Sequence, residues 1–152
     1  VIRLPEKADE IVNEQLKRIS NPDRQAEYRF ISPSVSPRKE VRDSVFEALL
    51  VADNRRTEPW ASTALSLLNH RLREAESVEY ILPALEILEE VQRTGDIFFP
   101  TAWLRALLGG HSSVQARDEV EAFYAEYPDF PEMLLNKIRQ QADHLYRLHA
   151  GE

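Results

Sequence analysis

The chain contains no cysteine, which excludes disulfides and zinc sites built on thiolates. Its four glycines are too scattered to form a phosphate-binding loop. No stretch reaches the roughly 18 apolar residues of a membrane span, and no apolar segment preceded by positive charge marks a secretion signal at the start. These absences exclude several classes of protein but do not fix the cellular compartment.

Positive charge is also scarce. The 19 Lys and Arg residues face 26 Asp and Glu residues, giving a formal net charge of −7 with the two signs mixed along the chain. A field of this sign repels nucleic acid, and no basic stripe with interleaved aromatic residues offsets it. We therefore expect no nucleic-acid partner.

What the sequence does contain is helical periodicity. Apolar residues recur at three- and four-residue intervals over most of the 152 residues, and no segment alternates as a strand does over five residues. The pattern predicts an all-α protein. Residues 1–36 are expected to hold a first helix, from Pro5 to Ile19, and an extended or single-turn connector that buries Tyr28, Phe30 and Val35.

Residues 37–152 predict about three helix hairpins. Ser36 and Pro37 suit a helix start, and Ser77 is the predicted cap of the longest helix, which Pro83 should kink before it ends at Gly95. The hairpins begin at intervals of roughly 38 residues, as in helix-pair repeats. We predict a single domain over residues 1–152 in which antiparallel hairpins stack as a right-handed solenoid like HEAT and armadillo repeats. A non-repetitive helical bundle is the alternative.

The stretch RTGDIFFP, residues 93–100, interrupts this periodicity. It predicts a corner in which Gly95 adopts a left-handed conformation and Asp96 caps neighbouring amides. The next three residues are expected to be buried at the joint, and Pro100 to begin the following helix. Those three residues are Ile97, Phe98 and Phe99.

Catalytic patterns are weak. The histidines, at positions 70, 111, 144 and 149, include no pair with the i, i+4 spacing of a zinc helix, and we expect the last two to be exposed. His111 and Ser112 follow two glycines, but a serine nucleophile elbow needs a strand before its turn. The adjacent acids Glu89 and Glu90 point about 100° apart on a helix and cannot flank one substrate. The residues alone thus define no catalytic site, and a serine hydrolase at Ser112 is the least favoured hypothesis.

The order of several short motifs nevertheless resembles one family. The resemblance covers roughly residues 21–148 and is strongest in the run QRTGDIFFP, residues 92–100. Other matching motifs are Asn21-Pro-Asp-Arg24, SPSVS at 32–36, Val41-Arg-Asp43, Glu58-Pro-Trp60, Leu72-Arg73, Trp103-Leu104, His111-Ser-Ser113 and Tyr127-Pro-Asp129. In this order and spacing they resemble the C-terminal helical region of bacterial aminopeptidase N-like zinc metallopeptidases.

The resemblance implies a non-catalytic role for this chain. In that family a separate catalytic domain of the same polypeptide binds zinc through H-E-x-x-H and grips the peptide amine with G-x-M-E-N, and neither motif occurs here. We therefore expect a fragment, beginning at Val1, that walls off the substrate chamber and restricts access of peptides to the zinc site, with no metal or cofactor of its own. Arg93 and Asp96 are the candidate contacts with the catalytic domain or the chamber. The alternative is a stand-alone α-solenoid scaffold that binds a partner protein or peptide.

Overall fold

The computed structural model describes residues 1–151, and every regular element in that range is helical, which confirms the all-α prediction. The chain divides into two compact units, Val1–Leu68 and Asn69–Glu152. That a single domain spans the whole chain stays a prediction.

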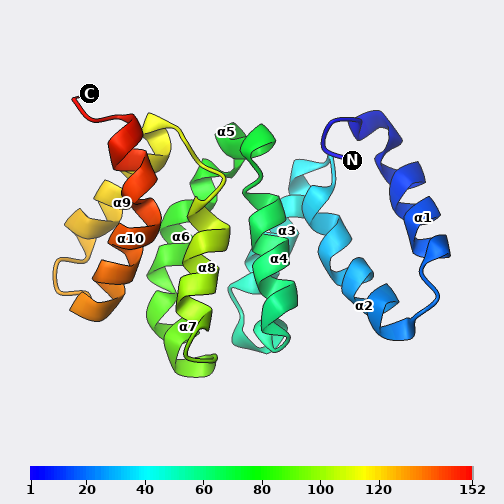
Figure 1. The fold of residues 1–152 in the computed structure, drawn as a ribbon, viewed down its shortest axis with the longest axis horizontal. Coiled ribbons are helices and arrows are strands. Elements are labelled where there is room, and N and C mark those ends of the chain that lie inside the picture. Colours follow the sequence, from blue (N-terminus) through cyan, green and yellow to red (C-terminus); the bar gives the residue numbers. More distant parts are fainter. Residues whose placement is uncertain (152) are drawn as a thin grey trace. The chain divides into compact units, whose positions relative to one another are not determined.

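The first unit is built from four α-helices and three short 3-10 turns (Figure 1). Within it, α4 packs against both α2 and α3, while α1 packs against α2. The α-helices are α1 (Ala8–Arg18), α2 (Pro22–Ile31), α3 (Lys39–Leu49) and α4 (Glu58–Leu68), and the 3-10 turns are η1 (Pro5–Lys7), η2 (Ser32–Val35) and η3 (Ala52–Arg55).

Helix α2 corrects the prediction of a connector before residue 37. Asn21 lies within the predicted connector, but its side-chain oxygen accepts hydrogen bonds from the amides of Asp23 and Arg24, at 2.8 and 3.3 Å, and so caps the start of α2. Only η2, at Ser32–Val35, has the predicted single-turn form. Phe30 is half-buried rather than buried, as are Tyr28 and Val35, and its ring centroid lies 5.8 Å from that of Trp60.

Two arginines in this unit are buried, which the sequence pattern does not indicate. Arg42 and Arg55 are each 3% exposed. A guanidinium nitrogen of Arg42 donates to the Ser36 carbonyl at 2.8 Å, and one of Arg55 donates to the Leu49 carbonyl at 2.8 Å. Leu49 is the last residue of α3, where a cation also favours the negative end of the helix dipole. The two arginines therefore fasten the segments before and after α3. That helix begins at Lys39 rather than at Pro37, and the Ser36 hydroxyl accepts from the Arg38 amide at 3.2 Å.

The second unit holds the larger share of the buried apolar residues. Within it α8 packs against α6, α7 and α10, and α9 packs against α6 and α10 (Figure 1). Its elements are η4 (Arg71–Arg73), α5 (Glu74–Ser77), η5 (Val78–Tyr80), α6 (Ile81–Glu86), α7 (Leu88–Thr94), α8 (Phe99–Leu108), α9 (Val114–Glu126) and α10 (Glu132–Leu148).

The predicted long helix from Ser77 to Gly95 is wrong. A 3-10 turn precedes α6, and Ile87, with φ −95° and ψ 7°, separates α6 from α7. Pro83 is the third residue of α6. The first four amides of a helix have no acceptor within the helix, so the missing amide hydrogen of Pro83 costs no intrahelical hydrogen bond. The Ser77 side chain makes no capping hydrogen bond, and its hydroxyl donates to the Arg73 carbonyl at 3.2 Å. The longest helix is α10, with 17 residues.

The centre of the second unit is Trp103, which is fully buried on α8. Its indole nitrogen donates to the carbonyl of Ala84 at 3.1 Å, and this hydrogen bond links α8 to α6. Phe99, one helical turn earlier, makes an edge contact with the Trp103 ring. These contacts make Trp103 a core residue that joins α6 and α8 through buried atoms.

Candidate functional site

The two predicted site residues flank one junction, since Arg93 lies in the last turn of α7 and Asp96 lies in the turn that connects α7 to α8. This connecting turn begins at Gly95, which has φ −116° and ψ −179°. This is extended backbone that any residue can adopt, so the predicted left-handed conformation is wrong. The only positive-φ glycine within residues 1–151 is Gly151.

Asp96 holds the shape of this turn. Its side-chain oxygen accepts from the Phe98 amide at 2.9 Å, and its carbonyl accepts from the Phe99 amide at 3.0 Å. An aspartate that bonds the amide two residues ahead fixes the backbone locally. The prediction that Asp96 caps neighbouring amides is therefore confirmed.

The turn presents two large apolar side chains to solvent. Ile97 is 78% exposed and Phe98 is 77% exposed, whereas Phe99 is only 4% exposed. Burial was predicted for all three, and it is wrong for the first two. We call Ile97 and Phe98 the apolar tip.

The helical phase of α8 explains the difference. Phe99 precedes buried Trp103 by four residues and lies on the same helix face. Phe98 precedes exposed Arg105 by seven residues, which is about two helical turns. Phe98 therefore lies on the same outward face of α8 as Arg105. That phase was the available sequence signal, and counting apolar residues alone missed it.

Arg93 lies in the last turn of α7, beside the apolar tip in sequence. Its side chain is exposed and makes no hydrogen bond or ion pair with the residues that the structure describes. Asp96 is exposed as well, although one carboxylate oxygen is used inside the turn. The end of α7 thus places an exposed cation close in sequence to the two exposed apolar groups of the tip. A contact through Arg93 and Asp96 stays a prediction.

A second polar region surrounds the loop between α8 and α9. His111 is 1% exposed, and its Nε2 lies 2.8 Å from the side-chain oxygen of Asn69. Burial lowers the pKa of His111 to about 4, with Glu74 opposing the shift and His144 adding to it. A Cβ on Gly110 would stand 2.1 Å from the Asn69 carbonyl oxygen. The loop therefore lies directly against the segment at residue 69.

The two C-terminal histidines also fasten this loop. Nε2 of His144 lies 2.9 Å from the His111 carbonyl oxygen and 3.2 Å from that of Leu108. Nε2 of His149 lies 2.7 Å from the Ser112 carbonyl oxygen. Carbonyls only accept, so each Nε2 donates here. Both histidines are half-buried rather than exposed as predicted.

Ser112 is not arranged as a nucleophile. Its hydroxyl donates to the Glu74 carboxylate, at 3.0 and 3.1 Å, and its amide donates to the same group at 2.7 Å. No hydrogen bond joins the hydroxyl to an imidazole, which a serine hydrolase needs for activation. Neighbouring Ser113 caps α9 by accepting from the Ala116 amide at 3.1 Å. Together these histidines, Ser112 and Glu74 hold the loop between α8 and α9 in place through hydrogen bonds.

The residues that follow α9 form an aromatic cluster. Phe123 contacts the rings of both Tyr127 and Phe130 at centroid distances of 5.0 Å. The Tyr127 hydroxyl donates to the Glu86 carboxylate, and this hydrogen bond raises the pKa of Tyr127 to about 12. An open recess of about 300 Å³ lies beside the cluster, with Glu89 among the acids that line it. The aromatic residues pack at a helix corner, and the acids give the recess a negative rim.

Among residues 1–151, no group of three or more His, Cys, Asp or Glu side chains is placed to hold a metal ion. In the same range, no helix has both the length and the apolar character that crossing a bilayer requires. Comparison of the chain with protein-family models, with curated proteins and with solved structures finds no match.

Proposed function

We propose that this chain is the non-catalytic C-terminal domain of a zinc-dependent aminopeptidase. In this proposal the zinc, its ligands and the hydrolysis of N-terminal residues from peptides belong to the catalytic domain of the same polypeptide. The chain described here encloses the substrate chamber and restricts access to the zinc site, and it does not hydrolyse peptides alone. The ordered motifs that resemble this family are the sequence basis of the proposal.

The observation that carries the proposal is the apolar tip. Ile97 and Phe98 lie in the QRTGDIFFP run, where the resemblance is strongest, and both are more than three-quarters exposed. Holding two large apolar side chains in water is unfavourable, by roughly 25 cal/mol for each Å² that a partner could cover. Asp96 keeps their backbone in one conformation, so little order is lost on contact. A neighbouring domain that covers the tip is the simplest reason for this arrangement.

The helix pairing in the second unit supports the solenoid part of the proposal. The first hairpin pairs α6 and α7, which are separated at Ile87, with α8, and it is followed by the hairpin of α9 and α10. The first helices of the two hairpins meet through α6 and α9, and the second helices meet through α8 and α10. Like-to-like stacking of successive hairpins is the arrangement of helix-pair repeats. We propose that it belongs to a right-handed HEAT-like stack.

The full protein encoded by the source gene provides the test. We expect its reading frame to encode H-E-x-x-H and G-x-M-E-N before residue 1, and the purified product to bind zinc and to hydrolyse aminoacyl-arylamides until a chelator is added. Phe98→Ser and Arg93→Ala should lower peptide hydrolysis while leaving zinc content unchanged. Chelator-sensitive hydrolysis by residues 1–152 alone would contradict the proposal, as would an initiator codon directly before Val1.

The second candidate is a stand-alone scaffold that binds a partner protein or peptide. The apolar tip favours it as well, because an exposed apolar pair suits any protein partner. The gene distinguishes the two proposals, since a scaffold requires no metallopeptidase motif upstream.

A further inference from the structure

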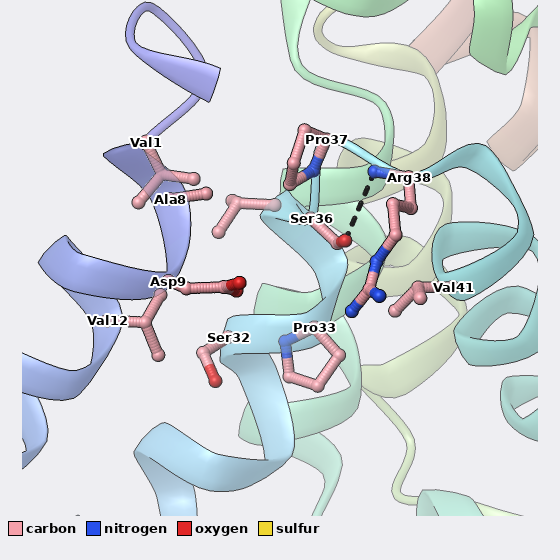
Figure 2. Close-up of a pocket in the computed structure, with 11 residues that line it drawn as sticks. Val1, Ala8, Asp9, Val12, Ser32, Pro33, Ser36, Pro37, Arg38 and Val41 are labelled. Carbon is pink, nitrogen blue, oxygen red and sulfur yellow. Dashed lines mark hydrogen bonds between the residues drawn. The ribbon is translucent and has the colours of Figure 1, made fainter. Parts of the chain in front are cut away.

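The first unit contains a groove that none of the features above explains. It lies between α1 on one side and the segment from η2 to the start of α3 on the other (Figure 2). Its volume is about 190 Å³. Cavities that enclose drug-sized ligands measure about 300–1,000 Å³, so this groove suits a smaller molecule.

Opposite charges project into the groove from its two walls. The carboxylate of Asp9 extends from α1, and the guanidinium of Arg38 descends from the segment before α3 (Figure 2). Neither side chain forms an ion pair or a side-chain hydrogen bond with residues 1–151. The groove is therefore lined by an anion from one wall and a cation from the other that form no ion pair with each other.

The lining between these charges is mainly apolar. Val12 belongs to the α1 wall, and Pro33 and Val41 belong to the other wall (Figure 2). A ligand that fits must carry a cation for Asp9, an anion for Arg38 and an apolar group for the lining. Arginine forms two parallel, charge-assisted hydrogen bonds with a carboxylate, which a carboxamide, with one uncharged oxygen, cannot reproduce.

We propose that this groove binds a free α-amino acid with an aliphatic side chain. Its ammonium group contacts Asp9, its carboxylate contacts Arg38, and its side chain packs against Val12 and Val41. The small volume and the charge on both walls favour a single zwitterion over a longer peptide. This binding activity is independent of the proposed aminopeptidase role, because it requires neither zinc nor a catalytic domain.

Titration of the isotope-labelled chain 1–152 with leucine, followed by amide NMR, tests the proposal. We expect leucine to shift the resonances of residues around the groove, with affinity in the millimolar range or tighter. Leucinamide lacks the carboxylate and N-acetyl-leucine lacks the ammonium group, and each should bind about tenfold more weakly or worse. Equal shifts with all three compounds, or no shift at the groove with leucine, would overturn the proposal.

Single variants assign the two ends of the ligand. Asp9→Asn should abolish the preference for leucine over N-acetyl-leucine, and Arg38→Gln should abolish the preference for leucine over leucinamide. Glu10→Gln and Arg24→Gln remove matched charges from exposed positions of the same unit that do not line the groove. Both controls should retain both preferences. If the controls lose them as well, the effect is general electrostatics and the site is wrongly assigned.

Discussion

His111 is a titratable residue held almost fully inside the second unit, with Asn69 as the partner of its Nε2. Its Nδ1 is buried without a hydrogen-bond partner, so the neutral ring is favoured. Burial lowers the pKa of His111 to about 4, whereas an unfolded histidine takes up its proton near pH 6.5. Between these values the unfolded chain binds the additional proton, and stability therefore falls as pH falls.

We expect the free energy of unfolding to drop by about 2 kcal/mol between pH 7 and pH 5 from this residue alone. Urea denaturation at the two pH values measures the drop. The variant His111→Gln keeps a side chain that can hydrogen-bond Asn69 but cannot titrate, so its stability should change much less over the same interval. An equal pH dependence in the variant and the wild type would show that other groups cause it.

Gly110 is required by close packing rather than by its backbone angles. An added Cβ would lie 2.1 Å from the Asn69 carbonyl oxygen and 3.2 Å from the Arg71 amide nitrogen, and both are backbone atoms that cannot rotate away. We expect Gly110→Ala to destabilise the protein by at least about 1–3 kcal/mol, measured by urea denaturation. Gly95→Ala, at extended backbone, is the comparison and should cost less. Equal stability of the two variants would contradict the close approach.

At the scale of elements, the neighbouring residues Phe98 and Phe99 at the start of α8 should contribute very unequally to the free energy of unfolding. Phe99 is 4% exposed and contacts Trp103, whereas Phe98 is 77% exposed. We expect Phe99→Ala to lower the free energy of unfolding by about 3–5 kcal/mol and Phe98→Ala to change it by less than about 0.5 kcal/mol. Thermal and urea denaturation of the two variants provide the comparison. A large loss from Phe98→Ala would mean that the apolar tip is packed in solution.

The sequence predicts some elements well because their apolar residues fall on one helix face. In α8 and α10 that face is buried as predicted, with Trp103 and Ile138 fully covered. The start of α2 was missed because an Asn-Pro pair both follows one helix and begins the next. The break at Ile87 was missed because apolar periodicity continues through it, and Leu85 and Leu88 are both fully buried. The apolar pattern shows which side chains can be buried, but tertiary packing determines where the helix is interrupted.

The candidate site was predictable only in part. The role of Asp96 follows from local chemistry, since an aspartate readily bonds the amide two residues ahead. The outward direction of Phe98 follows from the helical phase of α8, but whether another surface covers Ile97 and Phe98 depends on tertiary structure, which local sequence does not contain. The groove between Asp9 and Arg38 is harder still to predict, because it joins residues from two segments that pack together only in the folded unit.

At the scale of the whole molecule, the division between Leu68 and Asn69 allows the two units to unfold separately. The first unit holds few fully buried apolar residues outside α3 and α4, whereas buried residues occur throughout α6 to α10. Burial of apolar surface is the main favourable contribution to folding. The second unit should therefore be the more stable one.

The two tryptophans report on the units separately, because Trp60 lies in the first and Trp103 in the second. After labelling with 5-fluorotryptophan, each should give its own ¹⁹F resonance, which the variant Trp60→Phe assigns. We expect the folded Trp60 signal to disappear at a lower urea concentration than the folded Trp103 signal, since fewer buried contacts hold the first unit together. Coincident transitions would instead support the prediction of a single cooperative domain over residues 1–152. Loss of the Trp103 signal first would contradict the inference drawn from the distribution of buried residues.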